Sequence, residues 1–252
     1  MNKMLPTTRT AQLAHLRRSL AAGADSHFAR FGHPEIDRLA GGLRWAVLHE
    51  VFADDGHGGA ATGFAAALAR LCQNEKSLFW IRQDFSALEQ GEISAYGFFQ
   101  LGLDPGRLFL MRAADACDAL RAGLEALTCR FLGSVVLEIP GAPRILDLTA
   151  TRRLQLAARE HGVTVFLLRF AAKPEPSACE TRWFVKAAPS QEEEWGSPVL
   201  DVKLERNRHG PTGHWVMEWS ADGFFRKADS GHLAAASFNR SDQTQQQLRH
   251  SA

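Results

Sequence analysis

"EVFADDGHGGAATGFAAALARL", residues 50–71, is the stretch that decides the predicted fold. An apolar strand over 47–52 leads into a glycine-rich turn and then into an alanine-rich helix predicted over 62–73. This is the layout of a phosphate-binding loop. In such a loop glycine amides and a helix N-terminus hold phosphate, a lysine neutralises its oxygens, and a Ser or Thr binds Mg²⁺.

The side chains that this chemistry needs are missing from the stretch. With the strand ending at Phe52, Gly58 takes the place of the second loop glycine, and Gly59 takes the place of the lysine. No Lys or Arg occurs between Arg44 and Arg70. The sequence therefore predicts a degenerate loop, made of Gly56, Gly58, Gly59 and Thr62, that binds no cofactor and supports no catalysis.

Two acids in the turn, Asp54 and Asp55, add repulsion against a phosphate. A carboxylate about 5 Å from a phosphate charge costs roughly 3 kcal/mol at an effective dielectric constant near 20. The loss of the lysine contact is of similar size. An ordinary connecting turn is the favoured interpretation, and a weak residual anion site stays open.

Short apolar runs then alternate with helical stretches along the chain. The runs lack polar alternation, as do strands that are buried on both faces of a parallel sheet. They are predicted strands over 47–52, 77–81, 107–111, 134–139 and 163–169, with helices over 62–73, 85–101, 113–129 and 149–161. Thr149 or Thr151 is a plausible N-cap of the last helix, and Gly162 ends it. This order predicts an α/β sheet with helices on both faces.

The pattern changes after residue 180. "TRWFVKAAPS" (181–190), "PVLDVKLERN" (198–207) and "GHWVMEWS" (213–220) alternate apolar and polar residues, which predicts an antiparallel C-terminal extension. Residues 171–180 read as a loop because they contain two prolines and several charges. We expect three parts: an N-terminal helix within 1–25, a core over 26–225 and a disordered tail over 226–252.

The composition is that of a globular chain. The 252 residues are 45% hydrophobic and 23% charged, with a net charge of +1, so any basic patch must be local. Four cysteines without metal-binding spacing predict buried free thiols in a reducing cytoplasm. The sequence shows no signal peptide, no run of about 20 apolar residues that could span a bilayer, no HExxH zinc motif and no GxSxG elbow. We expect a cytoplasmic protein without a metal site.

The order of several less common segments resembles a known family. "FGHPEIDRLAGGLRWAVLHEVF" (31–52) resembles the beginning of a RecA-type core. "GLDPGRLFLMR" (102–112) and "LDLTATRRLQLAAREHGVTVFLLR" (146–169) fall where that core has its middle strands and helices. Together with "TRWFVKAAPS" and "LERNRHGPTGHWVMEWS" (204–220), they resemble the ImuA family, the RecA/SulA-like accessory proteins of bacterial mutagenic translesion synthesis. The resemblance spans residues 12 to 220.

The resemblance implies a RecA-like mostly parallel sheet and a non-catalytic accessory role that is induced by DNA damage in the SOS response. The expected partner is an ImuB-like Y-family polymerase relative and, indirectly, an error-prone C-family DNA polymerase. Two other functions stay open: a DNA-stimulated RecA-related ATPase and a SulA-like inhibitor of cell division. In an ATPase of this type, Glu138 would hold the position of the metal-binding carboxylate, and Asp84 that of the catalytic one.

The same resemblance indicates a candidate partner groove. RecA relatives assemble by placing an N-terminal helix of one subunit on the next core, on a surface that corresponds here to 107–129. The candidate groove residues are Leu110, Met111, Leu120 and Leu124, and the candidate docking helix carries Leu13, Leu16 and Leu20. Filling the protein's own core is the alternative role for these side chains.

Single-stranded DNA is an open further partner. RecA-type cores bind it through two loops, which correspond here to "PGAPRILD" (140–147) and "RFAAKPEPSACETR" (169–182). The candidate DNA contacts are Arg144, Arg152, Arg153, Lys173 and Arg182, since clustered cations can follow a phosphate backbone. The basic hairpin 203–214 is a further candidate, and a solvated surface is the alternative for all of them.

Overall fold

A computed structural model describes residues 28–73, 75–190, 198–220 and 223–226. These ranges hold nearly all of the predicted core. The predicted N-terminal helix with Leu13, Leu16 and Leu20 lies outside the described residues, and so does all but the first residue of the predicted tail. No helix within the described ranges combines the length and the apolar character needed to cross a bilayer.

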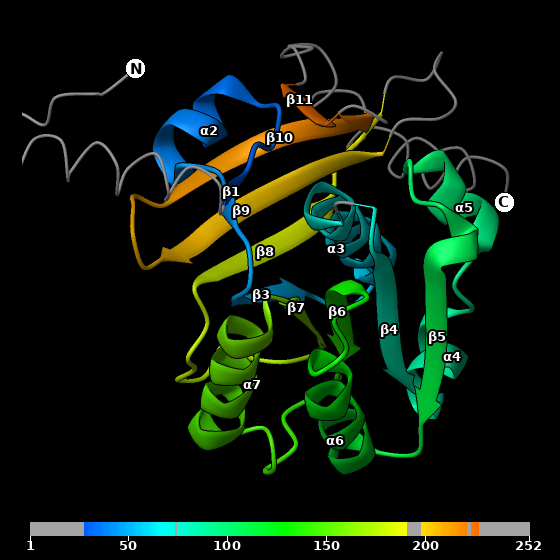
Figure 1. Cartoon of the computed structure of the whole chain (residues 1–252). Coiled ribbons are helices and arrows are strands. Elements are labelled where there is room, and N and C mark those ends of the chain that lie inside the picture. Colours follow the sequence, from blue (N-terminus) through cyan, green and yellow to red (C-terminus); the bar gives the residue numbers. More distant parts are fainter. Residues whose placement is uncertain (1–27, 74, 191–197, 221–222, 227–252) are drawn as a thin grey trace, which may run out of the picture.

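One nine-stranded sheet organises the described residues, in the spatial order β11-β10-β9-β8-β3-β7-β6-β4-β5 (Figure 1). Neighbouring strands are parallel from β8 to β5, whereas β9, β10 and β11 form the antiparallel extension. The strands are β3 (Leu48–Ala53), β4 (Ser77–Gln83), β5 (Leu108–Ala113), β6 (Leu132–Glu138), β7 (Thr164–Phe170), β8 (Thr181–Ala187), β9 (Val199–Asn207), β10 (Gly213–Ser220) and β11 (Gly223–Arg226). The predicted fold class is confirmed. β8 belongs to both parts of the sheet, because it is antiparallel to β9, as predicted, and parallel to β3, which was not predicted.

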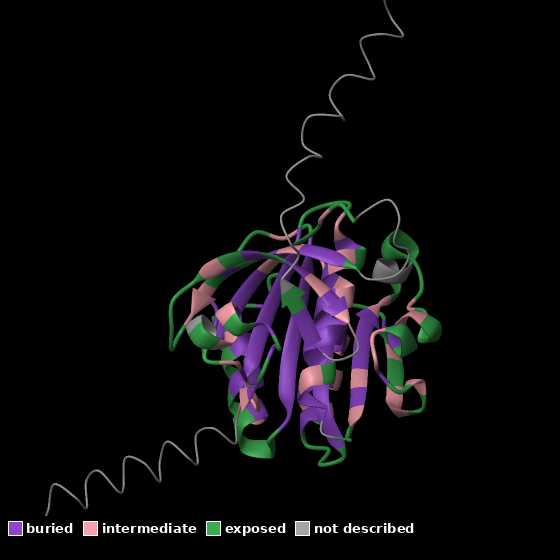
Figure 2. Ribbon diagram, turned by 90° about the horizontal axis from the view of Figure 1, so that it is seen from above, coloured by how far each residue is buried: buried purple, intermediate pink, exposed green. Residues whose placement is uncertain are grey.

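Helices cover both faces of the parallel part. α3 (Gly58–Cys72) packs on one face, and α6 (Ala116–Leu127) and α7 (Leu148–His161) pack on the other (Figure 1). The remaining elements are α2 (Pro34–Ala40), α4 (Asp84–Gln90), α5 (Ala95–Gln100), the 3₁₀ turn η1 (Pro105–Arg107) and a small antiparallel sheet of β1 (Phe28–Ala29) and β2 (Leu43–Arg44). Figure 2 shows buried residues running along the central strands between these layers.

Local signals explain where the helices begin and end, and they correct two predictions. Asp147, not Thr149 or Thr151, caps α7, because its carboxylate accepts from the Ala150 amide at 2.7 Å. Gly162 ends α7 in the left-handed conformation, as predicted. The single helix predicted over 85–101 is wrong. It is split into α4 and α5 after Gly91, whose φ of 75° ends α4.

The prediction that β5 is buried on both faces is also wrong. β5 is an edge strand that pairs with β4, and no second neighbour is found within the described residues. Phe109 and Leu110 are therefore 55% and 51% exposed.

The prediction of buried free thiols is confirmed for some cysteines only: Cys72 and Cys179 are buried, whereas Cys129 is exposed.

A polar relay holds the centre of the sheet together, because β3 is buried along its whole length and His49 lies within it. The Trp183 indole donates to the Thr181 hydroxyl at 2.7 Å, and the same distance separates that hydroxyl from His49 Nδ1. His49 Nε2 is 2.8 Å from the Arg44 carbonyl oxygen, so a neutral ring with its proton on Nε2 fits both contacts. Burial lowers the pKa of His49 to about 4.

We expect this histidine to make the protein less stable in mild acid. The unfolded chain binds a proton on His49 near pH 6.5, whereas the folded chain does so only near pH 4. Stability is therefore full above the unfolded pKa and falls as the pH drops through this window, by up to about 3 kcal/mol. Urea unfolding between pH 4 and 8 measures the slope of the free energy of unfolding against pH. His49→Gln should flatten it, whereas His161→Gln at the exposed end of α7 should not.

Substitution by alanine at two helical glycines should change the free energy of unfolding in opposite directions. A Cβ at Gly63 of α3 meets nothing within 4 Å, so Gly63→Ala should stabilise the protein by up to about 1 kcal/mol through helix propensity. A Cβ at Gly123 of α6 would lie 2.7 Å from a methyl group of Leu137, which is fully buried. Gly123→Ala should therefore lower the free energy of unfolding, by about 1–3 kcal/mol. Equal effects in a denaturation experiment would contradict this packing argument.

Candidate functional site

The predicted phosphate loop forms the turn between β3 and α3. The turn is closed by the His57 amide, which donates to the Asp54 carbonyl at 3.1 Å, and by Gly56 at a φ of 83°. α3 begins at Gly58, four residues earlier than predicted, because glycine and alanine continue into the helix without steric cost. The four predicted loop residues thus lie in this turn and in the first turns of α3.

β8 supplies this turn with a cation that is distant in sequence. Lys186 Nζ lies 3.0 Å from Asp54 Oδ2, and His57 Nδ1 accepts from the Ala187 amide at 3.2 Å. The Lys186–Asp54 pair is more than half exposed, so it contributes little to stability. Its effect on the site is to bind the turn to the end of β8.

The Glu138 carboxylate is fully enclosed by protein donors. Oε1 accepts from Arg82 Nη2 and Oε2 accepts from Trp80 Nε1, each at 3.0 Å. Arg82 and Glu138 are direct neighbours on β4 and β6, and both side chains are buried. Burial raises the pKa of Glu138, while the contacts with Trp80 and Arg82 lower it. In this arrangement Arg82 supplies the positive charge that a bound metal ion would otherwise supply to a carboxylate at this position.

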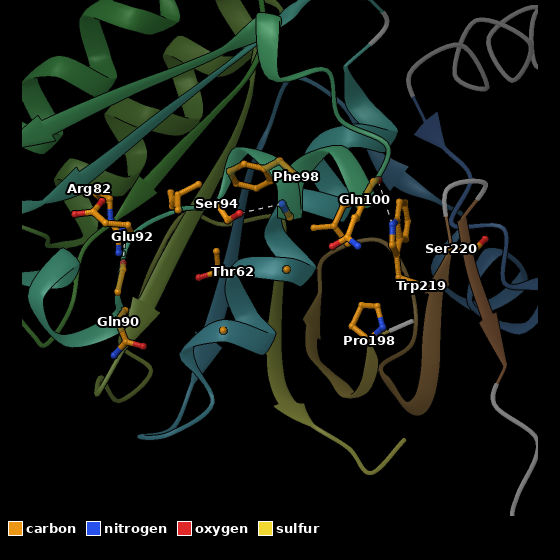
Figure 3. Close-up of a pocket in the computed structure, with 16 residues that line it drawn as sticks. Thr62, Arg82, Gln90, Glu92, Ser94, Phe98, Gln100, Pro198, Trp219 and Ser220 are labelled. Atoms are coloured by element: carbon orange, nitrogen blue, oxygen red, sulfur yellow. Dashed lines mark hydrogen bonds between the residues drawn. The ribbon is translucent and has the colours of Figure 1, made fainter. Parts of the chain in front are cut away.

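A cavity of about 640 Å³ lies beside the turn (Figure 3). Its walls are α3, the segment from α4 to α5, and the end of β10, as the labelled Thr62, Ser94 and Trp219 show in Figure 3. The Trp219 indole donates to the Leu101 carbonyl at 3.2 Å, which ties β10 to α5. Among the described residues that line the cavity, Arg82 is the single Lys or Arg, and it is bound to Glu138 and to the Gly91 carbonyl.

This cavity has the size of a small-molecule pocket. Its one described Lys or Arg, Arg82, is already paired with Glu138, so the described walls offer a triphosphate no further cation. The described residues also contain no group of three or more His, Cys, Asp or Glu side chains that could hold a metal ion. The arrangement favours apolar and hydrogen-bonding contacts over phosphate chemistry.

Comparison with known proteins identifies the family. No family model matches the chain. Two curated sequences named Protein ImuA, from two strains of Caulobacter vibrioides, are 32% identical over 209 residues and are aligned over 75% of this chain and 82% of their own length. The chain belongs to the ImuA family. The crystal structure of the RadB recombinase resembles the fold with a TM-score of 0.56 at 19% identity, over 79% of this chain and 100% of that one, which supports a RecA-like fold.

The four candidate groove residues of this ImuA-family chain do not lie on one face. Met111, Leu120 and Leu124 face the cluster beneath α6 and α7, whereas Leu110 is on the opposite face of β5, next to Trp80 of β4. Leu120 and Leu124 line a separate cavity of about 510 Å³ between α6 and the start of α7, together with Ile145 and Arg153. The alternation of a strand already separates residues 110 and 111, so the sequence could have shown this.

The five candidate DNA contacts differ in exposure. Arg144, Arg152, Arg153 and Lys173 are exposed at the surface of the ImuA-family chain. Arg182 is 8% exposed, and its Nε donates to Glu50 Oε2 at 2.8 Å while its Nη2 donates to the Glu175 carbonyl at 2.6 Å. The Arg182 side chain therefore stabilises the protein interior and is not a surface contact for DNA. No residue pattern in the sequence links it to Glu50, which is 132 positions away.

The Arg82–Glu138 pair should be necessary for stability. Arg82→Met leaves a buried carboxylate without its counter-charge, which costs about 3–5 kcal/mol. The double variant Arg82→Met, Glu138→Gln should regain part of this loss, because it removes the stranded charge as well. Chemical denaturation of the wild type, of Arg82→Met, of Glu138→Gln and of the double variant measures the coupling free energy. An additive double variant would show that the two side chains act independently.

Proposed function

We propose that this chain is a non-catalytic, RecA-like accessory factor of a DNA-damage-induced mutagenic translesion synthesis complex. It binds an ImuB-like Y-family polymerase relative and, through that protein, an error-prone C-family polymerase. Membership of the ImuA family supports this assignment.

The observation that favours a non-catalytic role is the Arg82–Glu138 pair beside a turn without a lysine. A RecA-type ATPase needs a loop cation for the phosphates and a free carboxylate for Mg²⁺. Here the turn carries Asp54, and both oxygens of Glu138 accept from protein donors. The same fold can then act as a rigid scaffold whose surfaces bind proteins.

The related ATPase is the competing function, and calorimetric titration of the whole chain with Mg-ATP separates the two. We expect no binding in the micromolar range, because the turn has no lysine of its own and the Lys186 ammonium that reaches it from β8 is already paired with Asp54. Micromolar binding accompanied by hydrolysis would replace the scaffold function with an ATPase.

Capture of the ImuB-like protein of the same organism by the tagged chain, with and without ATP, tests the assembly role. We expect capture that does not depend on ATP. Leu110→Glu and Leu124→Glu probe the two faces on which the candidate groove residues lie, and loss of capture in one variant identifies the face. Leu120 is unsuitable for this test because it is only 6% exposed and a charge there would unfold the core.

Leu88→Glu is the matched control, since Leu88 is 84% exposed on α4 and takes the same charge. Circular dichroism of each variant establishes that the fold survives. A wild-type chain that is folded but fails to capture the ImuB-like protein would overturn the assembly role.

A further inference from the structure

A basic cluster surrounds the segment Ser177–Glu180, at the end of the sheet opposite to the phosphate-loop turn. This buried segment precedes β8, and the Glu180 amide donates to the Leu48 carbonyl at 2.7 Å, where β3 begins. Basic side chains from separate elements converge on it. The members of the basic cluster are Arg44 of β2, Arg159 of α7, Arg206 of β9, and Arg208 and His209 of the turn after β9.

Glu180 is the anchor of the basic cluster. Its side chain is 2% exposed, and Oε1 lies 3.3 Å from Arg44 Nη1 and 2.8 Å from His209 Nε2. Oε2 is 3.6 Å from Arg159 Nη2 and accepts no hydrogen bond within the described residues. One buried carboxylate thus orients two arginines and a histidine, whose side chains are 36–59% exposed.

Backbone carbonyls fix the other two arginines. Arg208 Nε donates to the Cys179 carbonyl at 2.8 Å, and Arg206 Nη1 donates to the Ser177 carbonyl at 3.1 Å. These bonds use one of the five N–H donors of each guanidinium. Neutral carbonyls do not cancel charge, so the cluster has four arginines for the one carboxylate of Glu180 and keeps an excess of positive charge. With a net charge of only +1 on the whole chain, this excess is local.

From this geometry we infer that the basic cluster binds the phosphodiester backbone of a nucleic acid. Guanidinium groups match phosphate oxygens in pairs, and a pre-oriented guanidinium loses little conformational freedom on binding. Arg152 lies seven residues before Arg159, about two turns along α7, and is exposed on the same side of that helix. A phosphate track can therefore continue from the cluster along α7.

The surroundings favour a nucleic acid over an acidic protein segment. A protein interface normally centres on buried apolar anchors. Among the described residues, β2, β9 and the turn after β9 carry no large exposed apolar side chain, and α7 carries one between Arg152 and Arg159, Leu156, which is 65% exposed and therefore not a buried anchor. Those elements also offer no exposed Phe, Tyr or Trp ring for base stacking, and the exposed His209 ring lies against Glu180, so we expect the contact to be with the backbone and not to read sequence.

The site is separate from the proposed partner surface and does not depend on the proposed function. In Figure 1 the β9–β10 turn, the start of β8 and α7 lie on one side of the molecule, away from β5 at the far edge of the sheet. Nucleic acid bound there also stays away from Asp54, at the opposite end of β3.

Fluorescence anisotropy with a labelled oligonucleotide tests the site, as single strand and as duplex, over a range of salt concentrations. The full chain should bind, and the double variant Arg159→Glu, Arg208→Glu should bind at least about tenfold more weakly. For a single strand, the slope of log affinity against log salt should become shallower by about 1.4, because two phosphate contacts are lost. Comparing the two probes shows which form of nucleic acid the cluster prefers.

Lys76→Glu, Arg121→Glu is the control, because it makes the same change in net charge at exposed positions on other elements. It should change the affinity far less than the cluster variant. Arg159→Glu alone guards against misfolding, since Arg159 is half exposed and its one ion pair within the described residues is the 3.6 Å contact with Glu180. Equal weakening by control and cluster variants would overturn the inference. Absence of binding at low salt, or binding of a polyglutamate peptide but of neither oligonucleotide, would overturn it as well.

Discussion

The complete burial of β3 is the constraint on which the rest of the structure depends. β3 lies in the middle of the sheet, between β8 and β7, and all six of its residues are buried. Two of them, His49 and Glu50, are polar, and a buried polar group without a partner is costly. Each must therefore find a partner within the protein, and both partners, Thr181 and Arg182, come from β8.

This requirement fixes how the chain returns from β7 to β8. The connecting segment crosses to the other end of the sheet without a helix, and it is held by the Ala178 amide, which donates to Thr151 Oγ1 of α7 at 3.2 Å. The same crossing delivers Glu180 to the end of the sheet where β3 begins. The buried polar residues of one strand thus determine the position of a carboxylate that organises a distant surface.

The two ends of the sheet consequently differ in charge. The turn after β3 carries Asp54 and Asp55, and the nearby Glu138 is neutralised by Arg82. The opposite end presents the basic cluster around Glu180. The proposed functions divide along the same line: we propose no nucleotide binding at the first end, nucleic acid at the other end, and a protein partner near the edge strand β5.

The order of the elements, the buried parallel strands, the antiparallel extension and the missing loop lysine were all determined by the sequence, because hydrophobic pattern and residue type are local properties. Family membership was also evident from its segments. What local pattern could not show is which strand forms an edge, and β5 was therefore wrongly expected to be buried. Nor could it show which charged side chains pair: Arg82 with Glu138, Arg182 with Glu50, and Arg44 and Arg159 with Glu180 come from separate parts of the chain. Only the tertiary structure decided these pairings, because burial and charge neutralisation depend on neighbours in space.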